Sequence, residues 1–181
     1  MNKLIAALAL VFLTATAIAA TTPNTQDWEF LNTLQIVPEG DVTFLAAAKG
    51  DAHSQYILGN SFRYSGAYPA NKKLQVYWTK KAYEQGHAGA AGKLGYMYGS
   101  GYIVDRDWAR GIRMLEIAAD AGIVSAQFNL AQLLLQSTVA TDGQRAAYWF
   151  EKAASTSNGD DNIAANAMHE LAQLYSFGIY I

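Results

Sequence analysis

The sequence has no cysteine, only three prolines and few charged residues, which make up 15% of its 181 positions. The absence of cysteine excludes disulfide frameworks, thiol catalysis and cysteine-ligated metal sites. The scarcity of proline, with 51% hydrophobic residues, excludes a disordered or low-complexity chain. Basic and acidic residues, 13 against 15, nearly cancel, so the charge does not indicate a nucleic-acid partner. What remains is enough apolar material for a packed core in one domain.

Residues 1–19 are typical of a cleavable signal peptide. A cationic start at Lys3 precedes an unbroken apolar run at 4–13, which is shorter than the ~20 residues needed to span a bilayer. Ala17-Ile18-Ala19 then supplies the small residues that a signal peptidase recognises. We therefore expect cleavage after Ala19, no membrane span in the mature chain, and a location in the periplasm or outside the cell.

The rest of the chain contains a repeat with a period of 36 residues. A glycine recurs at Gly50, Gly86 and Gly122. A leucine recurs at Leu58, Leu94 and Leu130, and the same register returns at Leu171. Four residues after each leucine stands a large apolar residue: Phe62, Tyr98, Leu134 and Tyr175. The leucine and the large apolar residue are spaced as on one face of a helix, and each unit is predicted to hold two helices. An isolated pair of helices cannot bury its apolar face, so the sequence predicts an all-α fold, an α/α solenoid of stacked helix-turn-helix units.

The ends of the helices can also be predicted. Asp107 and Asp142 stand where an N-cap is expected, and the three glycines stand where a left-handed residue ends a helix. Small residues at Gly59, Gly95 and Ala131 are expected to let neighbouring helices approach closely.

These signals give an expected domain organisation. We expect an N-terminal cap with short helices at 20–49 and a repeat domain at 50–181, with units at about 50–85, 86–121 and 122–157 and a partial unit at 158–181. The partial unit ends in the apolar segment 177–181, and this end is a candidate surface for self-association.

The segment 91–122 resembles the Sel1-like repeat family. The residues that match the family's pattern, in order, are Ala91, Leu94, Gly95, Tyr98, Gly101, Val104, Asp107, Arg110, Ala118, Ala119 and Gly122. Gly111 and Met114 depart from the alanine and tryptophan that are usual in the family's pattern. Segment 142–154 matches the second helix of that pattern better, and segment 55–86 matches the pattern more weakly. The resemblance covers about residues 50–178 and implies a tetratricopeptide-like solenoid that serves as an adaptor in protein complexes.

Catalytic and metal chemistry finds no support in the sequence. His53, His87 and His169 lie in different units, and no two of them stand at i and i+4 on one helix, as in a helical zinc site. Neither a phosphate-binding loop nor a nucleophile elbow is present. We expect a protein that is not an enzyme, with no catalytic residue, metal site or cofactor. A hydrolase that acts on cell-wall material through His53 or His169 is the enzymatic alternative.

Binding is expected on the concave surface formed by the first helices of the units. The candidate residues flank the repeated leucines and differ from unit to unit: Tyr56, Asn60, Arg63, Tyr96, Phe128, Gln132, Gln136, His169 and Gln173. Tyrosine supplies contact area with a polar tip, arginine can bind a carboxylate, and amides can bond to a peptide backbone. We expect a protein or peptide partner and no nucleic acid. The alternative is an envelope module that binds peptidoglycan or another cell-wall ligand. Tyr56 and Phe128 could instead pack between helices.

Overall fold

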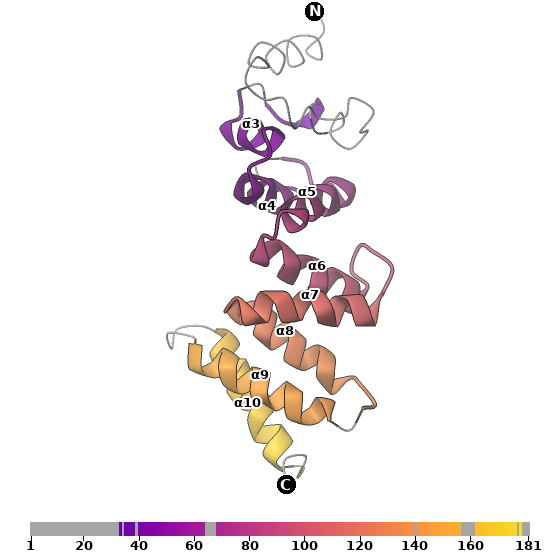
Figure 1. The fold of residues 1–181 in the computed structure, drawn as a ribbon, viewed down its shortest axis with the longest axis vertical. Helices are drawn as coiled ribbons and strands as arrows, with labels where there is room; N and C mark the ends of the chain where they lie inside the picture. The colour runs from indigo at the N-terminus through magenta and orange to yellow at the C-terminus, as the bar shows by residue number, and fades with distance from the viewer. Residues whose placement is uncertain are drawn as a thin grey trace, which may run out of the picture. The chain divides into compact units, whose positions relative to one another are not determined.

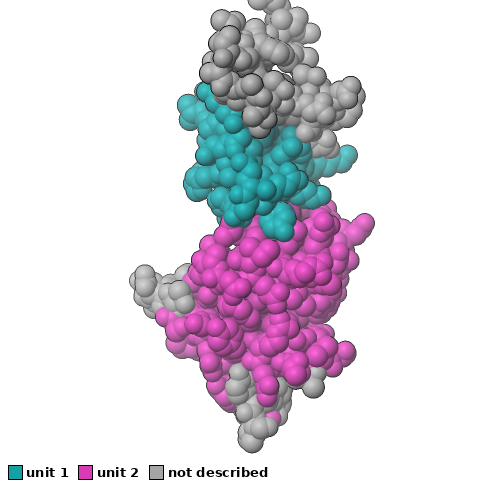
Figure 2. Space-filling model, viewed as in Figure 1, with its two compact units in different colours: residues 1–87 teal, residues 88–181 magenta. Residues whose placement is uncertain are grey.

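The computed structural model describes residues 33, 35–38, 40–63, 68–139, 141–156, 162–176 and 178. The predicted signal peptide and most of the apolar end at 177–181 lie outside the described residues. Every regular element within the described residues is a helix, so the prediction of an all-α fold is confirmed. None of these helices is long and apolar enough to cross a membrane. The chain divides into two compact units, residues 1–87 and 88–181, coloured teal and magenta in Figure 2.

Three helices among the described residues of unit 1 begin at side-chain caps: α3 (Val42–Ala48), α4 (Ala52–Ser61) and α5 (Lys72–Glu84) (Figure 1). The side chains of Asp41, Asp51 and Asn71 each accept a hydrogen bond from a backbone amide of the first turn, at 2.8, 2.6 and 3.1 Å. These bonds satisfy amides that have no partner within the helix. Gly50 and Gly86, with φ of +97° and +81°, follow α3 and α5 as predicted.

The core of unit 1 forms around Trp78. Its ring is 2% exposed and meets Phe44 edge-on, with 6.2 Å between the ring centroids. Its indole Nε1–H donates to Thr33 Oγ1 at 2.9 Å, which satisfies the one polar atom of the buried ring. Leu58 and Leu74 complete the contact between α4 and α5. A Cβ at Gly59 would lie 2.7 Å from Thr79 Oγ1, so glycine permits this close approach, as predicted.

The described part of unit 2 forms five helices: α6 (Ala88–Ser100), α7 (Trp108–Asp120), α8 (Val124–Leu135), α9 (Asp142–Thr156) and α10 (Asn162–Ser176). Each helix packs against the next along the chain, and α6 also contacts α8 (Figure 1). The buried residues include the predicted leucines Leu94, Leu130 and Leu134. Apolar side chains on one face of each helix therefore form a continuous core through the unit.

The contact between α6 and α7 depends on glycine on both helices. A Cβ at Gly95 would lie 2.8 Å from the backbone nitrogen of Leu115, and one at Gly111 would lie 2.6 Å from the backbone nitrogen of Gly99. Both distances are shorter than a carbon atom tolerates. The close approach predicted at Gly95 is thus observed, and Gly111 takes part in it from the opposite helix.

Two buried glutamines connect successive helices at equivalent positions of the repeat. Gln55 on α4 donates from Nε2 to the carbonyl of Ala47 near the end of α3, at 3.0 Å. Gln127 on α8 makes the same bond to the carbonyl of Ala119 on α7, at 3.2 Å. Each amide satisfies a carbonyl of the last helical turn. The separation of 72 residues between the two glutamines, which is two periods of the repeat, therefore has a structural cause.

The predicted N-cap at Asp142 is wrong, whereas Asp107 caps α7 by accepting from the backbone amide of Arg110 at 2.9 Å. Asp142 is the first residue of α9, and its carboxylate accepts from the guanidinium of Arg145 at 2.7 Å. Asp107 follows Asn71 by 36 residues, but Asp142 follows Asp107 by 35. Asp142 nevertheless keeps the spacing of seven residues to Trp149 that Asp107 keeps to Met114, so its carboxylate lies inside the helix because α9 begins one residue earlier in this register than α7 does.

The core pattern also changes in α10. Leu174 is buried, but Ala172 and Tyr175, at core positions in the predicted repeat, are exposed, Tyr175 to 51%. The phenol of Tyr175 donates to Glu151 at 2.9 Å instead of packing in a core. Among the described residues α10 packs chiefly on α9 and more weakly on α8, so only part of its surface is covered.

Candidate binding cavity

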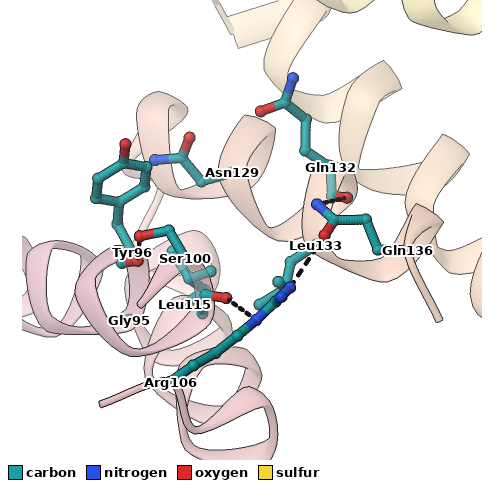
Figure 3. Close-up of a pocket in the computed structure, with 10 residues that line it drawn as sticks. Gly95, Tyr96, Ser100, Arg106, Leu115, Asn129, Gln132, Leu133 and Gln136 are labelled. Atoms are coloured by element: carbon teal, nitrogen blue, oxygen red, sulfur yellow. Dashed lines mark hydrogen bonds between the residues drawn. The ribbon is translucent and has the colours of Figure 1, made fainter. Parts of the chain in front are cut away.

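A cavity of about 290 Å³ lies within unit 2, between α6, α8 and the connection that leads into α7. Its apolar floor includes Leu115 and Leu133, both buried. The polar side chains around it are Tyr96, Ser100, Arg106, Asn129, Gln132 and Gln136. Figure 3 shows Arg106 running along one side to Gln136, with Tyr96 and Asn129 on the opposite side. An apolar floor with a few polar groups around it is typical of a ligand site.

Arg106 is held in position by three contacts. Its Nε–H donates to the carbonyl of Gly99 at 2.9 Å, and Nη2 donates to Gln136 Oε1 at 3.1 Å. Its guanidinium carbon lies 4.4 Å from the centroid of the Trp108 ring, within the range of a cation–π interaction. Gln136 is oriented in turn by a bond from its Nε2 to the carbonyl of Gln132, at 3.3 Å. The cation therefore lies in a defined place although its side chain is exposed.

The opposite side of the cavity is built on α6. The hydroxyl of Ser100 donates to the carbonyl of Tyr96 at 2.6 Å and accepts from the amide of Tyr102 at 3.2 Å. The ring of Tyr96 is 43% exposed and lies 6.4 Å from that of Tyr102. A bound chain would therefore meet an aromatic surface here, while the side-chain amides of Asn129 and Gln132 offer donors and acceptors.

Tyr96, Gln132 and Gln136 are the predicted binding residues that the structure brings to this cavity. Two others in unit 2, His169 and Gln173, lie on α10, where their side chains bond to each other at 2.8 Å. Phe128 is half-buried against Phe150, with 5.5 Å between the ring centroids, so it takes the packing role that the sequence left open.

The predicted residues of unit 1 lie in other surroundings. Tyr56 stacks on the ring of His87, with 4.6 Å between the ring centroids. Asn60 is half-buried, and its Oδ1 has no hydrogen-bond partner among the described residues. Arg63 is exposed in the turn after α4.

The structure also brings together two histidines that the sequence analysis treated separately. His53 Nδ1 lies 3.4 Å from His87 Nε2. Burial lowers the pKa of His87 below 6.5, and the charge of His53 lowers it further, although the nearby Asp51 opposes this. In the part of the chain that the structure describes, no group of three or more acidic residues or histidines is arranged to hold a metal ion.

The lowered pKa of His87 predicts a loss of stability in mild acid. Between 6.5 and the pKa of the folded state, the unfolded chain binds more protons than the folded chain, so the free energy of unfolding falls as the pH drops below 6.5. Urea unfolding at about pH 7.5 and about pH 5.5 measures this fall, because the interval spans ordinary histidine titration. We expect a smaller fall in His53→Gln and an unchanged fall in His169→Gln. An equal fall in all three proteins would contradict the assignment.

Arg106, Ser100 and Asn129 are cavity residues that sequence reasoning missed. Asn129 immediately precedes the repeated Leu130, whereas most of the predicted binding residues on the first helices stand two residues from a repeated leucine. When the repeats are aligned, the residues one position before the leucines are Ile57, Lys93 and Asn129. This comparison would have shown that Asn129 is polar and differs from its equivalents. Arg106 lies in an irregular connection, where helical periodicity gives no direction for a side chain.

The Sel1 repeat pattern matches residues 52–87, 88–123, 124–156 and 165–181, which together form most of the chain. The chain belongs to the Sel1 repeat family. The resemblance noted in segment 91–122 is thereby confirmed, and so is the fold, an α/α solenoid of helix-turn-helix repeats. The cavity lies between the first helices of two successive repeats, because α6 opens the match at 88–123 and α8 the match at 124–156.

Similar proteins come from several bacteria. An uncharacterized protein of Neisseria meningitidis serogroup B is 30% identical over 136 residues, which are 75% of this chain and 27% of the relative. A protective antigen of uropathogenic Escherichia coli with the same fold has a TM-score of 0.65 and 25% identity, covering 75% of this chain and 28% of that one. A Sel1 repeat protein from Oxalobacter formigenes has a TM-score of 0.59 and 29% identity, covering 72% and 95%. The chain therefore spans little more than a quarter of the first two proteins.

Sel1 repeat proteins generally mediate protein–protein interactions, and their fold is generally a non-enzymatic scaffold. Sel1 repeats therefore suggest protein partners in general. The family does not specify which surface binds or what the partner is.

Proposed function

We propose that this Sel1 repeat protein is an exported, non-enzymatic adaptor that binds an extended segment of a partner protein in the cavity between α6 and α8. The observation that carries the proposal is the convergence of Tyr96, Gln132 and Gln136, which belong to two repeats, around one cavity. These residues vary between repeats while the core residues around them recur. Recognition of a specific partner requires surface residues that differ from repeat to repeat on a core that stays the same.

The chemistry of the cavity supports a peptide segment as the ligand. The amides of Asn129 and Gln132 can each donate and accept, as the backbone of an extended chain does. Leu115 and Leu133 form an apolar floor that would cover a small side chain. Backbone bonds would give affinity, and the floor would give preference for particular side chains.

Export is proposed from the sequence at 1–19. The cationic start, the short apolar run and the small residues at Ala17 and Ala19 support a signal that is removed on secretion. Sequencing the amino terminus of the protein recovered from the periplasm or culture medium tests this. A chain that begins at Ala20 is expected, and retention of Lys3 in the recovered protein would refute cleavage.

The adaptor function is tested by cross-linking capture from an envelope extract with the purified protein as bait. We expect one or a few proteins to be captured, and we expect Tyr96→Ala/Gln132→Ala to lose them while its helical circular dichroism is unchanged. The matched control is Arg113→Ala/Ser125→Ala, which alters exposed residues of α7 and α8 outside the cavity. Because few contact residues carry most of the binding energy, at least a tenfold loss of captured partner is expected.

Two other outcomes would change the proposed binding site or the proposed ligand. Capture that survives in the cavity variant would place the interface elsewhere on the protein. If the protein captures no partner but pellets with purified cell-wall sacculi, and Tyr96→Ala/Gln132→Ala abolishes pelleting, the cavity binds a wall ligand and the adaptor function is refuted.

A further inference from the structure

We infer that the cavity binds its partner through a carboxylate group, which Arg106 holds. This inference rests on the proposed function, because it specifies the chemistry of the segment that the cavity receives. Arg106 is the one charged side chain among the ten described residues that line the cavity. These lining residues thus carry a net positive formal charge, although the chain as a whole has a formal charge of −2.

Arg106 forms no salt bridge with another of the described residues. Its two hydrogen bonds go to uncharged acceptors, the carbonyl of Gly99 and the side-chain amide of Gln136. A guanidinium has five N–H donors, and these two bonds use one donor of Nε and one of Nη2. Donors therefore remain for a ligand, and a carboxylate is the group that best matches them in charge and shape.

The contacts that hold Arg106 also prepare it for binding. The Trp108 ring and the two hydrogen bonds fix the side chain before a ligand arrives. An arginine that is already ordered loses less conformational entropy on binding than a mobile one. The neighbouring Gln136, which is itself bonded to the carbonyl of Gln132, keeps the guanidinium at the edge of the cavity.

The remaining lining residues complete a site for a short peptide end. The apolar floor of Leu115 and Leu133 can cover one apolar side chain beside the carboxylate. Asn129 and Tyr96, on the opposite side from Arg106 (Figure 3), can bond to the preceding peptide group. The inferred ligand is therefore a peptide carboxylate, either at a carboxyl terminus or on an acidic side chain.

Three small probes that differ in the carboxylate test the inference. N-acetyl-leucine carries a terminal carboxylate, N-acetyl-leucinamide has the same shape without the charge, and N-acetyl-glutamic acid α-amide carries the carboxylate on a side chain. Nuclear magnetic resonance of the purified protein follows the side-chain signals of Arg106 Nε–H and of Asn129, Gln132 and Gln136. We expect a Kd on the order of 1 mM for a probe of this size.

The expected result is at least a tenfold preference for a carboxylate probe over N-acetyl-leucinamide, since charge-assisted hydrogen bonds are about twice as strong as neutral ones. Whichever carboxylate probe binds more tightly identifies the source of the group. Arg106→Gln should abolish the preference, and Arg113→Gln, which removes an exposed charge of α7 outside the cavity, should keep it. Added salt should reduce the preference in the wild type.

The outcomes separate this inference from the proposed function. Equal binding of N-acetyl-leucine and its amide would overturn the carboxylate and leave peptide binding in the cavity intact. A preference that persists in Arg106→Gln would overturn the role of Arg106. If none of the probes shifts the cavity signals, the inference is overturned, and partner capture by the Tyr96→Ala/Gln132→Ala variant decides the proposed function separately.

Discussion

Replacing Trp78 with alanine is expected to lower the free energy of unfolding by about 3–5 kcal/mol, the range for deleting a buried aromatic side chain. Trp78 is 2% exposed and packs edge-on against Phe44 in the core of unit 1. The substitution also removes the donor that bonds to Thr33 Oγ1, and Thr33 is itself fully buried. The substitution therefore creates a cavity and removes a buried hydrogen bond in the same place, and their costs add.

Urea unfolding followed by circular dichroism measures this loss, and amide hydrogen exchange locates it. Exchange is expected to accelerate in α4 and α5, because Trp78 lies on α5 in the core of unit 1, where α4 packs against α5. The matched control is Trp149→Ala, at the equivalent position of a later repeat, where the ring is only half-buried. Equal losses in the two variants would show that the burial of Trp78 does not determine the stability of unit 1.

Gly111→Ala is expected to destabilise unit 2 by about 1–3 kcal/mol, the range for overpacking a well-packed contact. The added Cβ would lie 2.6 Å from the backbone nitrogen and 2.7 Å from the Cα of Gly99. Backbone atoms cannot move aside as a flexible side chain can, so α6 and α7 must separate. The better helix propensity of alanine, worth roughly 1 kcal/mol, offsets only part of this cost. Alanine is usual at this position in the family, so the expected result is specific to this chain.

Thermal and urea unfolding measure the effect, with Gly92→Ala as the matched control. A Cβ at Gly92 would lie 3.1 Å from the Cβ of Ala118, which is a milder contact and one with a side chain. We expect Gly92→Ala to cost less than Gly111→Ala. Because Gly99 lines the cavity, Gly111→Ala should also perturb the signals of Arg106, whose Nε–H donates to the carbonyl of Gly99. Stability equal to or above that of the wild type would show that the two helices are not held at this distance.

Much of the helical architecture could be predicted because it depends on short-range chemistry. Asp107 caps its helix where the sequence indicated, since a cap needs only a side-chain oxygen within reach of the third amide that follows. Gly50, Gly86 and Gly122 adopt positive φ where predicted, because the repeat ends its second helices there. The cap at Asp142 failed because α9 begins at Asp142 itself, whereas α7 begins one residue after Asp107, and the period of the repeat does not fix the residue at which a helix starts.

The binding site could be predicted only in part. The exposed positions of the first helices follow from the repeat, which gave Tyr96, Gln132 and Gln136. Arg106 could not be found in this way because it reaches α6 and α8 from an irregular connection, and its partner Gln136 is 30 residues away along the chain. The contact between His53 and His87 could not be predicted for a similar reason. The two residues are 34 positions apart, and the spacing of histidines within a single helix says nothing about a contact between distant segments.

The sequence by itself determined the family, the all-α repeat and the core residues of the first three repeats, because these follow from a period that recurs from one unit to the next. Only the tertiary structure decided which polar side chains converge, where the positive charge of Arg106 lies and which aromatic residues pack internally. The physical reason is that burial on a helix repeats with its turns and can be read locally. The position of a side chain in a cavity depends instead on how two helices and a connection pack against one another.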